Sequence, residues 1–353
     1  MSGSPMAAED WRRLVDVDRL RVWMDDQHLA SGPIEGVVPL TGGTQNILVR
    51  FRREGREFVL RRPPAHPHLD GSKTMQREAR VLAALAGSAV PHPRLIARCD
   101  DPGVLGAGFY LMEPVDGFTP VGTLPPKFAA SAALRQQMGW AMIDAIVELA
   151  DIDPVSVGLA DFGKLDNYLK RQVVRWRGQL DSYRAYAGWP GLAGLPGVEA
   201  VDAWLEANLP REFKPGIVHG DFNLGNVMFH HDRPEIAALI DWELSTLGDP
   251  LLDLGWLLAS WCDPNGKGIL PDREVAPWQG FPRAEELVAR YAQRSGRDMS
   301  GMPWFCVLAC YKMAAINEGT YARALAGKAP MATGAAFHGN VLRLLDRAQG
   351  WMA

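Results

Sequence analysis

The sequence is poor in cysteine. It contains four cysteines, at positions 99, 262, 306 and 310, and no two of them form a Cys-x-x-Cys pair. A disulfide framework or a structural zinc site therefore has no support in the sequence. Cys306 and Cys310 lie one helical turn apart in an apolar segment, so we expect buried free thiols there. This cysteine usage is typical of a reduced, cytoplasmic protein.

The sequence also lacks a membrane-spanning segment and a strong excess of charge. No run of about eighteen apolar residues occurs, and the first residues, MSGSPMAAEDW, contain no apolar signal core. The net charge of −4 at pH 7 gives no basic surface for nucleic acid or an anionic membrane, so we expect neither as a partner. The 353 residues, 47% hydrophobic and 22% charged, suffice for one large globular domain or two lobes.

Acidic and amide side chains follow three short apolar runs in the second half of the chain. Two runs belong to the stretch 217–229, IVHGDFNLGNVMF, and the third precedes Asp241 in the stretch 238–243, ALIDWE. The apolar runs predict strands, and the polar loop between the first two contains Asp221 and Asn226. We expect Asp221, Asn226 and Asp241 to converge at one edge of a small sheet.

This set of groups suits phosphoryl transfer. One carboxylate can orient or deprotonate an attacking hydroxyl, while a second carboxylate and an amide oxygen hold magnesium against nucleotide phosphates. His219-Gly220-Asp221, followed by four residues and Asn226, has the spacing of the kinase catalytic loop. Buried Asp and Asn residues that cap turns in an unrelated protein are the alternative explanation.

The stretch resembles the aminoglycoside phosphotransferase-type branch of the kinase-like superfamily, in which Gly follows the catalytic-loop His. The continuation 248–255, GDPLLDLG, strengthens the resemblance, which extends from about Val17 to the C-terminus. Within that branch, the chain most resembles the kinase-like domain found beside, or fused to, acyl-CoA dehydrogenases. The resemblance implies an α+β, bilobal protein-kinase-like fold. A small antiparallel-sheet N-lobe would comprise residues 1–114, and a large helical C-lobe residues 115–353.

The resemblance also implies nucleotide-binding residues in the first lobe. Gly42 and Gly43 would form a flap over the phosphates, although a plain hairpin turn is the alternative. Arg61 stands where a kinase has lysine and would hold the phosphates, with Glu78 as its partner; an exposed ion pair is the alternative. The backbone from Glu113 to Val115 would bind the nucleotide base.

In the second lobe, the resemblance implies Asp221 as the catalytic base and Asn226 and Asp241 as the magnesium ligands. His219 would brace the catalytic loop, and Asp253 would hold its backbone. A second kinase-like motif, Asp161-Phe-Gly163, precedes the catalytic loop, so its place in the chain excludes it as the metal site. We expect Asp161 to cap the next helix.

That helix, predicted over residues 164–186, is basic and aromatic and would line an acceptor pocket. Arg171 and Arg175 lie one turn apart, beside Trp176, and could meet an anionic acceptor such as a CoA phosphate. Glu318 and Tyr321, near the end of the predicted helix 304–325, could border the same pocket. A solvated helix and ordinary helix packing are the respective alternatives.

The sequence thus predicts a small-molecule kinase that transfers the γ-phosphoryl group of ATP, with Mg²⁺, to an acceptor hydroxyl; GTP is an alternative donor. The resemblance implies a hydroxyacyl-CoA as the acceptor and an acyl-CoA dehydrogenase as a partner. Aminoglycosides, choline and sugars remain alternative acceptors. A nucleotide-binding pseudokinase with a regulatory role is the alternative from another class, favoured only by arginine at position 61.

Overall fold

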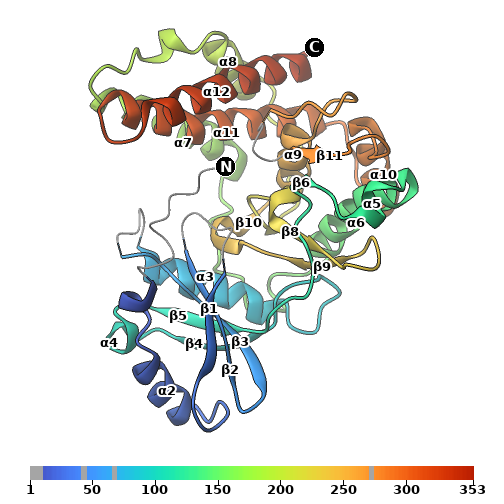
Figure 1. Ribbon diagram of the computed structural model, residues 1–353. Helices are drawn as coiled ribbons and strands as arrows, with labels where there is room; N and C mark the ends of the chain where they lie inside the picture. Colours follow the sequence, from blue (N-terminus) through green and yellow to red (C-terminus); the bar gives the residue numbers. More distant parts are fainter. Residues whose placement is uncertain (1–10, 41–45, 66–69, 270–273) are drawn as a thin grey trace. The chain divides into compact units, whose positions relative to one another are not determined.

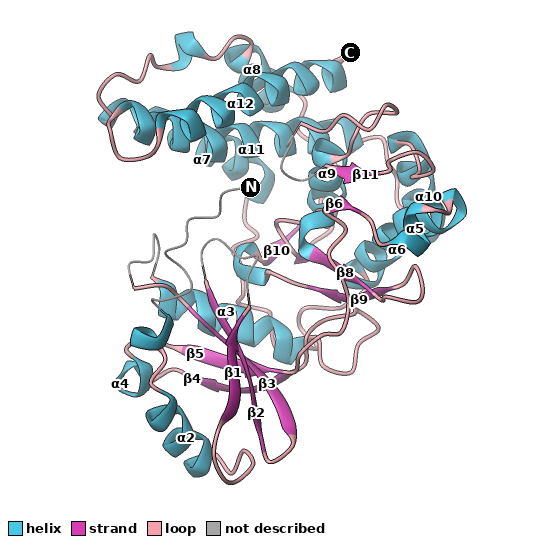
Figure 2. Ribbon diagram, in the orientation of Figure 1, coloured by secondary structure: helices cyan, strands magenta, loops and turns pink. Residues whose placement is uncertain are grey.

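A computed structural model of the chain describes residues 11–40, 46–65, 70–269 and 274–353 (Figures 1 and 2). The chain forms two compact units. The first unit comprises the residues up to Asp116 together with Ala237–Glu243, and the second comprises Gly117–Ile236 and Leu244–Ala353. Residues 237–243 were expected in the second lobe, within 115–353. The structure assigns them to the first unit because they bond to it: the Leu239 N–H, for example, donates to the Pro91 carbonyl (2.8 Å).

The first unit is built on a five-stranded antiparallel sheet with the strand order β1-β2-β3-β5-β4. The strands are β1 (Glu35–Pro39), β2 (Ile47–Arg53), β3 (Arg56–Arg62), β4 (Leu95–Cys99) and β5 (Phe109–Met112). β2 and β3 are joined by Glu54 and Gly55, which both have positive φ angles (49° and 72°). Two residues of this conformation match the right-handed twist of the strands they connect, so the turn sets the register of the hairpin.

Side-chain alternation along β3 separates a core face of the sheet from a polar one. Phe58 and Leu60 belong to an apolar cluster that also contains residues of α2 (Val17–Asp26), such as Met24. Arg61 points to the other face, where it meets α3 (Gly71–Ala84). Because neighbouring strand residues point to opposite faces, one short run supplies both packing and a charged site. A one-turn helix, α4 (Pro102–Leu105), completes the unit.

The second unit is mainly helical. Its helices are α5 (Pro126–Ala129), α6 (Ala132–Ala150), α7 (Tyr168–Ser182), α8 (Val198–Ala207), α9 (Leu251–Ser260), α10 (Ala284–Ser295), α11 (Met302–Leu325) and α12 (Met331–Met352). Its short strands are β6 (Gly122–Thr123), β7 (Gly216–Val218), β8 (Val227–Phe229), β10 (Thr246–Gly248) and β11 (Val275–Ala276). β9 (Ile236–Leu239) leads the chain into the first unit.

The long helix α11 forms the centre of the second unit and contacts α7, α8, α9 and α12 (Figure 1). Apolar residues occur all around it, as expected for a helix that is covered on every side. The unit contains a buried ion pair: the fully buried Asp249 accepts hydrogen bonds from both Nη atoms of Arg297 (2.7 and 3.0 Å). The helical part of the unit thus holds a charged group in its interior together with its partner.

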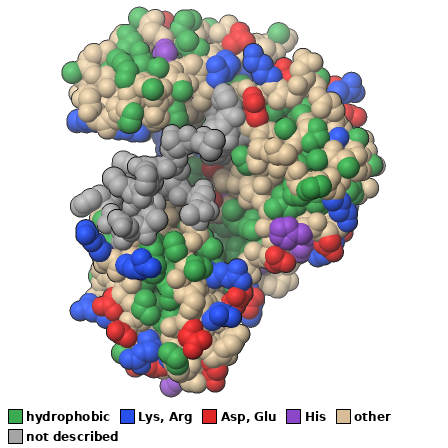
Figure 3. Space-filling model, viewed as in Figure 1, with side chains coloured by type: hydrophobic (Ala, Val, Ile, Leu, Met, Phe, Trp, Pro, Cys, Tyr) green, Lys and Arg blue, Asp and Glu red, His purple; other side chains and the backbone are tan. Residues whose placement is uncertain are grey.

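Two expectations from the composition can be compared with the structure. The four cysteines are free, and Cys306 and Cys310 are buried on α11, where burial raises the pKa of both thiols. No helix among the described residues is long and apolar enough to cross a bilayer. On the viewed face of the first unit, basic and acidic side chains are interspersed over the sheet strands (Figure 3).

Candidate active site

The catalytic loop lies between β7 and β8 in the second unit. Gly220 has a φ of +87°, and a Cβ atom built there would lie 2.3 Å from the Leu244 carbonyl oxygen. Both the left-handed backbone and the close approach require glycine. The arginine that protein kinases carry at this place could not be accommodated without moving the backbone near Leu244.

Three neutral donors hold the Asp221 carboxylate. Trp256 Nε1 donates to Oδ1 (2.7 Å), Asn223 Nδ2 donates to the same oxygen (2.9 Å), and Asn226 Nδ2 donates to Oδ2 (2.7 Å). Trp256 comes from α9, whereas the two asparagines belong to the loop itself. These bonds fix the direction of the carboxylate and leave it lone pairs with which to accept a proton.

Asp253, on α9, holds the backbone of the same loop. Its two oxygens accept hydrogen bonds from the N–H groups of His219 (2.7 Å) and Gly220 (2.8 Å). Burial raises the pKa of Asp253, although the nearby His219 and the two N–H groups oppose the rise. His219 Nδ1 in turn accepts from the Asp221 N–H (3.3 Å). The structure therefore brings His219, Asp221 and Asp253 together in one network.

Asn226 has the right atoms available for a cation. Its amide Nδ2 donates to the Asp221 backbone oxygen (2.9 Å) as well as to the Asp221 carboxylate. The hydrogen bonds of the side chain thus run through nitrogen, and among the described residues its Oδ1 accepts none. A neutral amide oxygen of this kind is a suitable ligand for magnesium.

The first unit contains a second cluster, centred on Arg61. Arg61 Nε lies 2.9 Å from Glu78 Oε2, and Nη2 lies 2.5 Å from Asp241 Oδ1. Tyr110, on β5, donates its hydroxyl to Glu78 (2.8 Å). Burial by itself would lower the pKa of Arg61, but the neighbouring Glu78, Tyr110 and Asp241 raise it overall, so the guanidinium stays charged. The Arg61–Glu78 pair is therefore a buried contact and not the exposed ion pair of the alternative.

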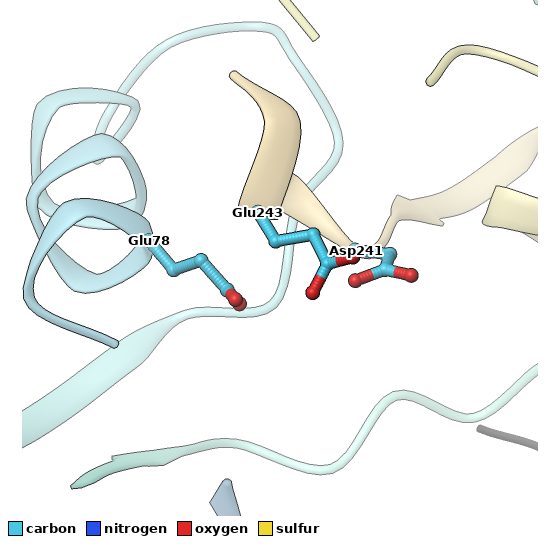
Figure 4. A group of neighbouring side chains, drawn as sticks. All are labelled: Glu78, Asp241 and Glu243. Atoms are coloured by element: carbon cyan, nitrogen blue, oxygen red, sulfur yellow. The ribbon is translucent and has the colours of Figure 1, made fainter. Parts of the chain in front are cut away.

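Asp241 and Glu243 complete this cluster from the segment that follows β9. The carboxylates of Glu78, Asp241 and Glu243 converge, with one oxygen of each within 4.8 Å of the others (Figure 4). Burial, followed by repulsion from Asp241 and Glu78, raises the pKa of Glu243 to about 7. Asp241 has a positive φ (68°), a strained conformation that typically persists where a side chain must be aimed at a site.

These residues fit a magnesium ion chemically. Asp241 uses one oxygen for Arg61, and among the described residues its other oxygen has no hydrogen bond. This oxygen is a hard donor of the type that Mg²⁺ prefers, and so, within the second unit, is Asn226 Oδ1. Glu243 is a further carboxylate donor beside Asp241, and its position two residues after Asp241 is the sequence signal for it.

The remaining residues predicted to bind nucleotide lie in different environments. Gly42 and Gly43 lie outside the described residues. The Glu113 N–H donates to the Arg94 carbonyl (2.9 Å), and the Glu113 carboxylate pairs with the Arg94 side chain, which lowers its pKa. Glu113 and Val115 follow β5 directly, at the end of the first unit. Their role towards a nucleotide base stays a prediction.

A basic cavity lies along α7. It has a volume of about 680 Å³, and its walls include four cationic side chains and no acidic one: Lys164, Lys170, Arg171 and Arg175. Trp176 is buried behind this face, with the Arg175 guanidinium 5.0 Å from its ring centroid. The structure thus places Arg171 and Arg175 on one cavity, as an anionic acceptor would require.

Two other predicted pocket residues are packed instead. Glu318 is fully buried, where it accepts from Trp189 Nε1 (2.7 Å) and lies 2.9 Å from His338 Nδ1. Tyr321 stacks on the ring of His338 (4.3 Å between centroids). These contacts favour the helix-packing alternative for both residues.

The expectation that Asp161 caps the next helix was wrong. α7 begins at Tyr168, with Asn167 as the preceding residue. Gly163 packs so closely against β10 that an added Cβ would lie 2.8 Å from Thr246 Oγ1 and 2.9 Å from the Leu247 nitrogen. We attribute the later helix start to this tertiary contact, because it keeps the segment around Gly163 in a non-helical conformation.

Comparison with known proteins agrees with this geometry. Residues 36–304 match the model of the phosphotransferase enzyme family. Acyl-CoA dehydrogenase family member 10 of Mus musculus is 32% identical over 308 residues, which cover 86% of this chain and 28% of that protein. Family member 11 of Homo sapiens is 31% identical over 312 residues, covering 86% of this chain and 39% of that protein. The chain therefore spans about a third of the length of these relatives.

The solved structures share the fold. A putative aminoglycoside phosphotransferase from Ralstonia eutropha has a TM-score of 0.78 and 29% identity, with 95% of this chain and 98% of that chain covered. An aminoglycoside phosphotransferase APH(4)-Ia in complex with ADP and hygromycin B has a TM-score of 0.57 and 14% identity, over 93% and 98% of the chains. The predicted α+β kinase-like fold is confirmed. The chain therefore belongs to the phosphotransferase enzyme family.

Proposed function

We propose that this phosphotransferase transfers the γ-phosphoryl group of ATP to a hydroxyl of a small molecule, with Asp221 as the base. The observation that carries the proposal is the Asp221 carboxylate, oriented by Trp256, Asn223 and Asn226 and left able to accept a proton. A carboxylate that served only to cap the loop would not need a partner from α9. Positioning of this kind is the main contribution of a protein to phosphoryl transfer.

Asn226 and Asp241 would hold magnesium. A bound magnesium ion neutralises part of the negative charge of the phosphates. Arg61 would steady the phosphates, and its buried partner Glu78 would keep the guanidinium in place. An arginine can perform this task because its planar fork binds phosphate oxygens in pairs. The presence of Asp221, Asn226 and Asp241 argues against a pseudokinase, because a protein that only binds nucleotide does not need a catalytic base.

The test is ATP consumption in the presence of Mg²⁺ with hydroxyacyl-CoAs, aminoglycosides, choline and simple sugars as acceptors, and with GTP as the alternative donor. We expect one acceptor class to stimulate turnover and Asp221→Asn to reduce it by about 10²- to 10⁴-fold. Asp346→Asn, an exposed position on α12, is the matched control and should leave turnover unchanged. ATP binding without any stimulated turnover would favour the pseudokinase alternative.

For the acceptor, we propose a hydroxyacyl-CoA. Two observations support this choice: the relatives are named as acyl-CoA dehydrogenase family members, and the cavity along α7 has four cations and no acid. A cationic acceptor such as an aminoglycoside would be repelled by this cavity, whereas the phosphates of CoA would be attracted. Aminoglycosides stay in the panel because a similar structure is described as a putative aminoglycoside phosphotransferase.

The cavity can be tested separately from the chemistry. The double variant Arg171→Ala/Arg175→Ala should raise KM for a CoA thioester about 10-fold or more, with the KM for ATP unchanged. Arg184→Ala is the matched control, because Arg184 is exposed just beyond α7 and does not line the cavity. An equal KM in the double variant and the control would rule out the cavity as the CoA-binding site.

We also propose an acyl-CoA dehydrogenase as a functional partner, since the matched relatives carry that name over a much longer chain. A purified acyl-CoA dehydrogenase should co-elute with this protein in size-exclusion chromatography. Alternatively, the dehydrogenase should act on a compound that is made from the phosphorylated product of this protein. Separate elution and no use of the product would contradict the partnership.

A further inference from the structure

A lysine occupies the middle of the long, largely buried helix α11. Lys312 lies on α11 between Tyr311 and Met313, which are both buried. A cation in such surroundings costs free energy unless its charge is compensated. Among the described residues, no carboxylate forms an ion pair with its ammonium group, although Asp221 and Asp253 favour the charged form from a greater distance.

The direct contacts of the ammonium group are with the catalytic loop and two tryptophans. Lys312 Nζ donates to the Gly220 carbonyl oxygen (3.0 Å). It also lies 4.4 Å from the ring centroid of Trp256 and 5.6 Å from that of Trp176. A carbonyl dipole and two aromatic faces can together stabilise the ammonium group of this half-buried lysine.

Lys312 and Asp253 hold the loop from two sides. Asp253 binds the N–H of Gly220 (2.8 Å), while Lys312 binds the carbonyl of the same residue, directly before Asp221. Lys312 further packs on Trp256, the residue that donates to the Asp221 carboxylate (2.7 Å). Both the backbone that carries Asp221 and the donor that orients its side chain therefore contact Lys312.

We propose that Lys312 is a positioning residue of the catalytic loop: its ammonium group fixes the Gly220 peptide and the Trp256 ring, and thereby the direction of the Asp221 carboxylate. The proposal rests on the role of Asp221 as the base. Lys312 does not touch the reacting groups itself. It acts through the loop and through the tryptophan.

The electrostatics of the site add a pH dependence. Burial lowers the pKa of Lys312 to about 8, although Asp221 on the loop and Asp253 on α9 oppose the decrease; Arg175 on α7 adds to it. The ammonium group is thus present below pH 8 and is lost as the pH rises through that value. Loss of the charge weakens the bond to the Gly220 carbonyl and the contact with both rings, so turnover should fall on the alkaline side.

The first experiment compares Lys312→Met with Lys312→Arg and with Lys267→Met, an exposed lysine that serves as the matched control. Lys312→Met keeps the length of the side chain and removes its charge. We expect kcat to fall about 10- to 100-fold, with the KM for ATP within about two-fold of the wild type. Lys312→Arg should regain part of the lost kcat and keep it to higher pH, because arginine does not titrate in this range. Folding is verified by the thermal melt of each variant.

The second experiment is independent of activity. In protein labelled with ¹³C-lysine, the resonance absent from Lys312→Met identifies Lys312, and its titration midpoint should lie near pH 8. In Asp221→Asn the midpoint should shift to lower pH, because the carboxylate that favours the charged form is gone.

A Lys312→Met protein with the kcat and pH profile of the wild type would overturn the proposal. If the wild type turns over no acceptor, the proposed function fails, and the titration decides the Lys312 contact alone. A midpoint that does not move in Asp221→Asn would then overturn it.

Discussion

Replacement of Arg61 by methionine should destabilise the first unit in a strongly pH-dependent way. Methionine has a similar length and no charge, so the change leaves the carboxylates of Glu78, Asp241 and Glu243 close together without their cation. The Glu78 side chain is 1% exposed and cannot be solvated when it loses Arg61. The variant must therefore either open the site to water or bind protons.

The expected loss of unfolding free energy follows from the two ion pairs that Arg61 forms. Arg61 is 10% exposed and Glu78 1%, so removing one partner of this buried pair should cost about 3–5 kcal/mol. The pair with Asp241, which is 35% exposed, is more strongly screened and adds about 1 kcal/mol or less.

The pH dependence follows from the pKa of Glu78. This pKa is already raised by burial, while Arg61 opposes the rise. Without Arg61 it rises further. A carboxyl group with a raised pKa in the folded state binds more protons folded than unfolded, so stability falls as pH rises through that pKa. The loss in the variant should thus be largest at pH 8 and smaller at pH 5, by about 1.4 kcal/mol for each unit of additional shift.

Hydrogen–deuterium exchange measured by mass spectrometry reports this effect unit by unit. After correction for intrinsic rates, peptides from β3 and α3 should lose protection in Arg61→Met, more at pH 8 than at pH 5. Peptides from α11 and α12 belong to the second unit and serve as the internal control. Unchanged protection of β3, or a loss independent of pH, would refute the reasoning.

Three further substitutions test the support of the loop and the core. Asp253→Asn turns an amide NH₂ towards one of the two loop N–H groups, so we expect kcat to fall at least about 10-fold and the unfolding free energy to fall by about 1–3 kcal/mol in urea titrations. Gly220→Ala would place a Cβ 2.3 Å from the Leu244 carbonyl oxygen at a φ of +87°, so acceptor-dependent turnover should be lost in steady-state assays; wild-type turnover would contradict this. Arg297→Met leaves the fully buried Asp249 without its cationic partner, so the unfolding free energy of the second unit should fall by about 3–5 kcal/mol in denaturant titrations. A decrease below about 1 kcal/mol would contradict the importance of the buried pair.

Local patterns in the sequence indicate several of the elements of both units. The strand signal in EFVLRR, residues 57–62, agrees with β3, in which Phe58 and Leu60 pack on one face and Arg61 lies on the other. The spacing of Asp221 and Asn226 likewise placed two functional groups on one short loop, where their separation of five residues leaves little freedom. Predictions of this kind depend on neighbours in the chain.

Contacts between distant segments could not be predicted in the same way. Lys312 lies 92 residues from Gly220, and Trp256 lies 35 residues from Asp221, so no periodicity links either pair. A lysine inside an apolar helix was the available signal for Lys312. Asp161 failed as a cap for the same reason, because a tertiary contact between Gly163 and β10 overrides the local capping preference.

The most direct measurement is the formation of phosphorylated acceptor, followed by mass spectrometry together with ADP, for the wild type, Asp221→Asn and Trp256→Phe. The account predicts one phosphorylated acceptor per ADP in the wild type and a loss of about 10²- to 10⁴-fold in Asp221→Asn. Trp256→Phe should show a smaller loss, because it removes only one of the three donors to the carboxylate. Phosphorylated acceptor formed by Asp221→Asn at the wild-type rate, or ADP formed without phosphorylated acceptor, would contradict the account.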